Sequence, residues 1–94
     1  MKKLVEVVQN SATSRKYSLR EVFINPEFVV SLVPDSNTQR LLQEGRLPEG
    51  LDSNLEFTRI VLHKGASGLE MVVVGGTKEV QTKLFSNSAK LLRG

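Results

Sequence analysis

Apolar and polar residues alternate in several short stretches that are separated by turn-forming residues, a pattern typical of β-strands. Three such stretches occupy the first third of the chain, at Lys3–Gln9, Leu19–Ile24 and Phe28–Val33. For the third stretch, alternation predicts that Val30 lies on the same face as Phe28 and Leu32. The other face is predicted to carry Val29, Ser31 and Val33.

The clearest pattern lies between residues 55 and 84, where two strands and a helix follow one another. Leu55–Lys64 and Leu69–Val74 are rich in β-branched and aromatic residues, and Gly65–Gly68 separates them as a hairpin turn. Gly75 and Gly76 then end the second strand, and Thr77 is predicted to cap a helix. We therefore predict a strand, a hairpin turn, a strand and a helix, in this order.

Both strands of this hairpin are apolar on both faces, unlike strands of a sheet that has one face in water. In the first strand, Leu55, Phe57 and Val61 share a side with Arg59, while Ile60 and Leu62 share the other with Thr58. The sheet must then either curl into a small barrel or have its second face covered by a helix or another subunit. We predict self-association, as a dimer, because one short helix is too small to cover this surface.

A short helix of about two turns is predicted over residues 38–44, because good helix formers follow the capping residues Asp35, Ser36 and Asn37. Gly45 is expected to end this helix in a left-handed conformation. Leu41 and Leu42 are its only apolar residues, so the helix can lie on the surface. Residues 46–54 resemble an irregular return loop.

The closing helix is predicted to run from Thr77 to about Phe85, with Val80 and Leu84 on its apolar stripe. Residues 86–88 interrupt this pattern, and residues 89–94 form either another helical turn or a loose tail. Together the elements predict a single small β-rich domain over residues 1–94. Its class is α+β: a bent antiparallel sheet or partial barrel of about five strands, with a short inserted helix and a C-terminal helix.

The composition indicates a globular protein, because 39% of the 94 residues are hydrophobic and 24% are charged. These proportions are ordinary for a folded soluble domain. No apolar stretch approaches the roughly 20 residues that a membrane helix needs, so no membrane association is expected. The chain has no cysteine. This excludes disulfides, thiolate metal sites and cysteine nucleophiles, and it makes the cytoplasm the default location.

The formal net charge is +3, and basic and acidic residues are interleaved along most of the chain. Arg15, Lys16, Tyr17 and Arg20 join cations to an aromatic ring, a combination that binds phosphates and stacks on bases. These four residues are the candidate nucleic-acid-binding site. The alternative is an ordinary charged edge that discourages strand pairing.

Other candidate motifs have simpler structural interpretations. His63 is the only histidine and has too few companions for a zinc site. Gly75-Gly76-Thr77-Lys78 lacks the spacing of a phosphate-binding P-loop. The strand carboxylates are expected to face solvent and to pair with basic residues; they are Glu6, Glu21, Glu56 and Glu70. We therefore predict no catalytic residue, no metal site and no cofactor, and a protein that is not an enzyme.

Three segments, Glu21–Leu32, Thr58–Gly65 and Val72–Val80, resemble small flagellar and swarming-associated proteins of the FlbD type. In that family a strand, an Asn-led step, a second strand, a hairpin around a glycine and a closing helix come in this order. This chain differs by its N-terminal strand and by the insertion at Asp35–Asn54. The same pattern resembles short tailed-phage proteins, which implies a small accessory or host-directed role.

The function that we expect is that of a small accessory or regulatory protein that acts through protein–protein interaction. Its partners would be another protein and further copies of itself, as a homodimer or a higher homo-oligomer. The alternative is a nucleic-acid-binding module that uses its basic loop edge. The two differ in whether the cations gather on one face or are scattered.

Overall fold

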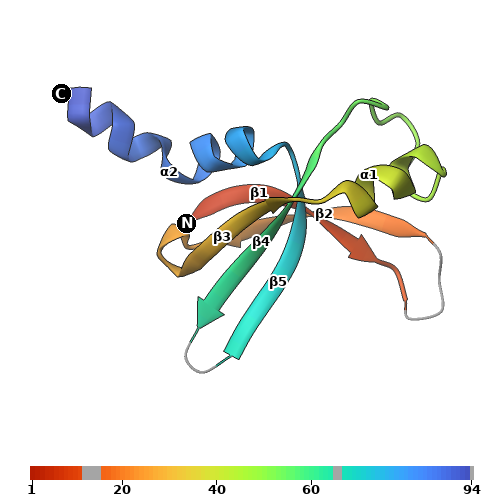
Figure 1. The fold of residues 1–94 in the computed structure, drawn as a ribbon, viewed down its shortest axis with the longest axis horizontal. Helices are drawn as coiled ribbons and strands as arrows, with labels where there is room; N and C mark the ends of the chain where they lie inside the picture. Colours follow the sequence, from red (N-terminus) through yellow and green to blue (C-terminus); the bar gives the residue numbers. More distant parts are fainter. Residues whose placement is uncertain (12–15, 65–66, 94) are drawn as a thin grey trace.

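The computed structural model describes residues 1–11, 16–64 and 67–93, and it contains one five-stranded antiparallel sheet and two α-helices (Figure 1). The strands are β1 (Lys2–Gln9), β2 (Tyr17–Ile24), β3 (Val29–Pro34), β4 (Phe57–Lys64) and β5 (Ser67–Val74), and the helices are η1 (Pro26–Phe28, 3₁₀), α1 (Ser36–Gln43) and α2 (Thr77–Arg93). The predicted α+β class, with an inserted helix and a C-terminal helix, is confirmed.

The strands lie in the order β2-β1-β5-β4-β3, so β2 and β3 are the two edges of the sheet. These edges are consecutive in the chain, and η1 connects them directly. Asn25 begins η1 by accepting a hydrogen bond from the Glu27 amide at 3.0 Å, and Pro26 occupies its first turn. Figure 1 shows the β1–β2 and β4–β5 hairpins splaying apart, so the sheet is strongly bent and remains open.

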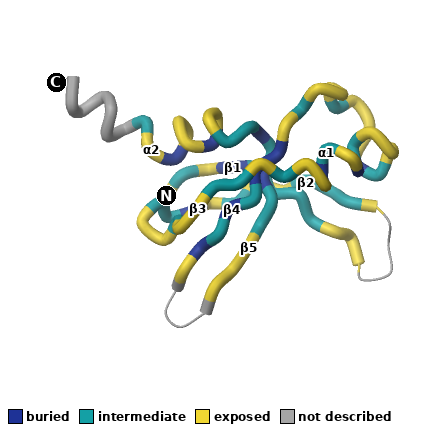
Figure 2. Tube along the Cα trace, in the orientation of Figure 1, coloured by how far each residue is buried: buried dark blue, intermediate teal, exposed yellow. Residues whose placement is uncertain are grey.

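The inner face of the sheet, defined by the pairs Leu4–Val22, Ile60–Met71 and Thr58–Val73, carries the main core. Val80 and Leu84 of α2 pack on this face and are 0% and 1% exposed. Figure 2 shows the buried segments where α2 meets the strands. The buried members of the core are Leu4, Ile24, Ile60, Leu62, Val73, Val80 and Leu84.

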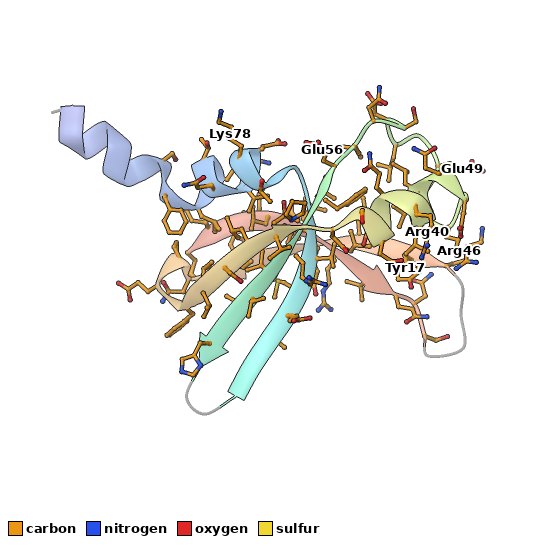
Figure 3. The ribbon with its side chains drawn as sticks, in the orientation of Figure 1. Tyr17, Arg40, Arg46, Glu49, Glu56 and Lys78 are labelled. Atoms are coloured by element: carbon orange, nitrogen blue, oxygen red, sulfur yellow. The ribbon has the colours of Figure 1, made fainter. Side chains whose placement is uncertain are left out.

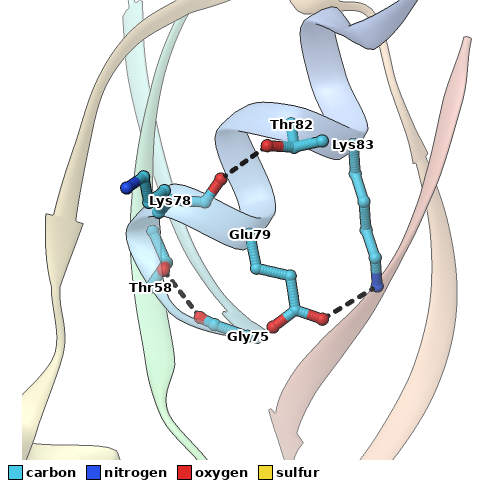
Figure 4. Close-up of polar contacts among 6 residues, drawn as sticks. All are labelled: Thr58, Gly75, Lys78, Glu79, Thr82 and Lys83. Carbon is cyan, nitrogen blue, oxygen red and sulfur yellow. Dashed lines mark hydrogen bonds and ion pairs between the residues drawn. The ribbon is translucent and has the colours of Figure 1, made fainter.

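The junction between β5 and α2 is held by hydrogen bonds to the backbone of Gly75, whose φ of +118° favours glycine. Its carbonyl accepts from the Thr58 hydroxyl at 2.7 Å (Figure 4). Its amide donates to the Glu56 carbonyl at 2.7 Å. The Val80 amide donates to the Gly76 carbonyl at 2.9 Å. Thr77 is therefore the first helical residue and not the predicted cap.

The helix α2 is longer than the sequence pattern predicted, because it continues past Phe85 to Arg93. Within its first two turns, the Thr82 hydroxyl donates to the Lys78 carbonyl at 3.0 Å, and Lys83 lies 3.7 Å from Glu79 (Figure 4). These contacts are one turn apart and support the exposed side of the helix. The polar residues 86–88 therefore do not end the helix.

The predicted faces of β3 were wrong because a bulge lies between Val29 and Ser31. A bulge adds one residue to a strand and shifts the alternation of all residues beyond it. Val29 and Leu32 therefore both pack against the core, while Val30 is 62% exposed. Phe28 belongs to η1 and not to the strand.

The helix α1 is not the surface excursion that its composition indicated. Leu41 of α1 is buried together with two residues that follow it in the chain, and none of the three belongs to the main core. Leu41, Leu47 and Phe57 are 7%, 6% and 2% exposed. α1 packs on β4, and the segment after it reaches β2, where the Tyr17 amide donates to the Arg46 carbonyl at 3.0 Å. Gly45 has the predicted left-handed conformation, with a φ of +78°.

Strand boundaries differ from the prediction by one or two residues, and the starts of β2 and β4 show why. β2 begins at Tyr17, two residues before Leu19, because the Arg46 carbonyl accepts from its first amide. β4 begins at Phe57, because the Leu55 amide donates to the Asp52 carbonyl in a preceding turn at 3.1 Å. The predicted hairpin turn falls partly on residues 65 and 66, which lie outside the described residues.

Candidate interaction site

Four large apolar side chains gather at the end of the sheet where η1 joins the edge strands. Met1, Phe23, Phe28 and Leu69 are 83%, 61%, 42% and 59% exposed. They surround a cavity of about 230 Å³ that we call the apolar mouth. Its remaining lining residues are Ile24, Asn25, Leu62 and Met71.

The floor of the apolar mouth is the hydrophobic core itself. Ile24 and Leu62 are buried members of the core, and Met71 packs against it. Asn25 is the one polar residue of the lining, and its side-chain oxygen is engaged by the Glu27 amide. The mouth exists because η1 joins the edge strands β2 and β3 without pairing them, which leaves core residues accessible between them.

The sequence did not single out the residues of the apolar mouth. They come from separate parts of the chain that only the strand order brings together, so no local spacing could reveal them. The one sequence signal for an exposed apolar site was that the hairpin has more apolar residues than one short helix can bury. That signal led to the prediction of self-association.

The four predicted nucleic-acid-binding residues do not share one face. Tyr17 pairs with Gln9 and Arg20 pairs with Glu6, and residues three apart on a strand point to opposite faces. The Arg20 side chain is ion-paired with Glu6 at 3.1 Å. Lys16 is exposed beside Tyr17, and Arg15 lies outside the described residues.

Another cation lies near Tyr17. The hydrogen bond from the Tyr17 amide to the Arg46 carbonyl brings the Arg46 backbone next to it, and Arg40 belongs to α1, the helix that precedes this segment (Figure 3). Arg46 is ion-paired with Glu44 at 3.3 Å, and Arg40 donates to the Asn37 side chain at 2.6 Å. Sequence reasoning missed both arginines because they are distant from Tyr17 along the chain.

The glycine pair before α2 does not form an anion-binding loop. The Glu56 carboxylate lies against Gly76, where a Cβ atom would clash with it. A carboxylate at a helix N-terminus is stabilised by the helix dipole and would repel a phosphate there. Glu56 and Lys78 are both marked in Figure 3 at this end of the helix.

Most of the remaining sequence candidates occupy ordinary surface positions. His63 is exposed and pairs with Gly68 near the end of the β4–β5 hairpin. Glu21 forms an ion pair with Lys3 at 3.4 Å, as Glu6 does with Arg20, so two of the four carboxylates have the expected basic partners. The Glu6 side chain is only 15% exposed and pairs with Val73 on the core face, so the prediction that it faces solvent was wrong. Glu70 is exposed on β5.

Comparisons of this chain with protein-family models, with curated proteins and with solved structures found no match. Within the ranges that the structure describes, no helix has both the length and the apolar character needed to cross a lipid bilayer.

Proposed function

We propose that this protein is a small, non-enzymatic accessory or regulatory protein of the cytoplasm, which binds a partner protein through the apolar mouth. The observation that carries the proposal is the convergence of Met1, Phe23, Phe28 and Leu69 around one cavity while each stays at least 42% exposed. Contiguous apolar surface of this kind marks interaction sites in soluble proteins, because leaving it in water is costly.

The size of the mouth favours a protein ligand over a small molecule. Its volume is about 230 Å³. Typical small-molecule pockets are larger, at roughly 300 to roughly 1000 Å³. The mouth has room for one large apolar side chain, and the surrounding aromatic and aliphatic side chains supply a contact rim. Anchoring by one buried side chain is common at protein interfaces.

An accessory role agrees with the resemblance to FlbD-type and short tailed-phage proteins, which we retain as part of the proposal. The shared features are the strand, the Asn-led step at Asn25 and the hairpin with its closing helix. Two of these, the Asn-led step and the hairpin, supply residues of the mouth, at Asn25 and at Leu69.

The experiment is protein capture from a lysate of the native host, with and without nuclease. The test variant combines Phe23→Ser with Leu69→Ser, and Val30→Ser is the matched control because Val30 is equally exposed but lies outside the mouth. We expect a nuclease-resistant protein partner that the double variant loses and the control retains. Equal capture by all three proteins would contradict the role of the mouth.

A nucleic-acid-binding module is the second candidate, supported by the backbone hydrogen bond that brings Arg46 beside Tyr17. Fluorescence anisotropy with single- and double-stranded oligonucleotides at low salt tests it. Replacing Arg15 and Lys16 with alanine should lower the dependence of log affinity on log salt by about two units if both contact phosphates. Arg46→Ala should lower it by about one further unit. Absence of binding at tens of micromolar protein would eliminate this candidate.

A further inference from the structure

The outer face of the sheet, opposite the core, carries an arginine among valines. Arg59 of β4 pairs with Val72 of β5 on one side and with Val33 of β3 on the other. Val7 of β1 follows next to Val72 in the same row of the sheet. All four residues are partly buried, so the aliphatic part of the Arg59 side chain lies among the three valines.

The Arg59 guanidinium has no partner among the described residues. Its Nε atom is buried without a hydrogen bond, and none of the four ion pairs recorded for the described residues includes it. A buried donor without an acceptor is unfavourable, and a guanidinium is best satisfied by a carboxylate that can accept two of its hydrogen bonds. The outer face is therefore complementary to an anion at this point.

A carboxylate lies on the same face, close to Arg59 but not bonded to it. Glu70 of β5 pairs with Val61, and Arg59 pairs with Val72, so the two charged residues are diagonal neighbours. Diagonal Cβ atoms on adjacent strands are about 7–8 Å apart. Glu70 is exposed and takes part in none of the ion pairs recorded for the described residues.

An exposed acid and an unsatisfied base on one face make that face self-complementary. A two-fold axis that passes between Arg59 and Glu70 would place each of them opposite the other in a second copy. Two identical ion pairs would form, and the surrounding valines would be covered at the same time. We propose that the outer face is the contact surface of a homodimer, in which Arg59 of each copy pairs with Glu70 of the other.

A second copy fits better than an unrelated acidic partner because the face offers a donor and an acceptor in equal number. An acidic ligand would satisfy Arg59 but would meet the negative charge of Glu70 beside it. The Phe57 end of this face is already covered, since α1 packs on β4 and Phe57 is 2% exposed. The dimer contact is therefore confined to the Arg59–Glu70 end, and the apolar mouth remains free for its own partner.

Charge reversal tests the proposal, with the dimer dissociation constant measured by analytical ultracentrifugation. We expect the wild-type chain to dimerise at micromolar concentration. Arg59→Glu and Glu70→Arg should each weaken the dimer at least about a hundredfold, because each places two like-charged pairs in the interface. An equimolar mixture of the two variants should form a heterodimer with near wild-type affinity, because both of its pairs are again opposite in charge.

Glu27→Arg is the matched control, since it makes the same change in charge at an exposed residue of η1. It should leave the dissociation constant unchanged. Circular dichroism verifies the folding of each variant. Should Arg59→Glu fail to fold, Glu70→Arg is decisive by itself, because Glu70 is exposed.

Three results would overturn the proposal. They are a wild-type chain that stays monomeric at high micromolar concentration, a Glu70→Arg dimer as tight as the wild type, and folded variants whose mixture forms no heterodimer. Loss of the dimer in the Phe23→Ser and Leu69→Ser double variant, with Glu70→Arg unaffected, would place the dimer contact at the apolar mouth instead.

Discussion

The two faces of the sheet are built from the same strands but are covered differently. On the inner face, α2 places Val80 and Leu84 over Ile60 and Val73, and all four are at most 1% exposed. On the outer face, α1 reaches only the end near Phe57, and the residues around Arg59 stay partly exposed. The inner face contributes stability, and the outer face retains accessible apolar surface.

This difference follows from where each helix is attached. α2 follows β5, a strand in the middle of the sheet, and can cross several strands of the inner face. α1 follows the edge strand β3 and consists of only 8 residues. A helix of this length spans little more than two turns, so it covers one end of the outer face. Apolar strand residues are therefore buried or left accessible according to the position of the helices.

The sharpest test compares Val73→Asp with Val72→Asp, which are neighbours on opposite faces. Val73 is 0% exposed. An unpaired carboxylate there should cost several kcal/mol and unfold the domain. Val72 pairs with Arg59, so a carboxylate at this position gains a cationic partner and should cost less than half as much. Urea unfolding at concentrations too low for dimerisation measures both, and equal losses would contradict the distinction between the faces.

Truncating the helix that covers the inner face should have the next largest effect. Leu84 is 1% exposed, whereas Phe85 on the same helix is 41% exposed. Leu84→Ala should cost about 2–5 kcal/mol of the free energy of unfolding. The control Phe85→Ala should change it by no more than about 0.5 kcal/mol. Thermal melts compare the stability of the two variants. A comparable loss of stability in both would mean that α2 packs on the sheet through a different side.

Leu41→Ala tests whether α1 contributes to the cover of the outer face. Leu41 is 7% exposed. Its loss should cost about 2 kcal/mol, at the lower end for buried leucines. Ser36→Gly in the same helix should cost about 0.5 kcal/mol or less, because only helix propensity changes. Ser36 is exposed, which makes it a suitable control. If Leu41→Ala lowers the melting temperature as little as Ser36→Gly does, α1 lies on the surface without contributing to the core.

The smallest expected effect is a gain. Arg59→Met removes a buried, unsatisfied nitrogen while keeping a long apolar stem. The change should stabilise the monomer by about 1 kcal/mol. The measurement is urea unfolding at concentrations too low for dimerisation, with Arg20→Met as the control because Arg20 is exposed and paired with Glu6. Destabilisation by Arg59→Met would mean that the guanidinium is satisfied within the monomer.

Element types were readable from the sequence because they depend on local pattern. Alternating apolar residues predicted the strands, helix formers that stop at Gly45 predicted α1, and Val80 with Leu84 predicted the buried side of α2. The predicted caps of α1 were wrong in detail, because Ser36 and Asn37 are helical and the Asp35 side chain makes no capping hydrogen bond. The bulge at Val30 was not predicted, since one extra residue in a strand leaves no mark in the sequence. The length of α2 was also missed, because the polar residues 86–88 favour an end that the helix does not have.

The candidate sites were far less predictable than the elements. Arg15, Lys16, Tyr17 and Arg20 were grouped by proximity in the chain, but strand geometry sends Tyr17 and Arg20 to opposite faces. The apolar mouth and the Arg59–Glu70 diagonal depend on strand order and register. Both are properties of residues that are distant in sequence.

By itself, the sequence of this protein determined which segments become strands and helices and that its strands are apolar on both faces. The tertiary structure decided which of these apolar faces became core, because burial depends on the strand order and on where α2 and α1 pack against the sheet. It also decided that Arg59 lacks a partner among the described residues and that Phe23 and Leu69 share one cavity. Local backbone preferences act over a few residues, whereas packing joins residues that only the completed fold brings together.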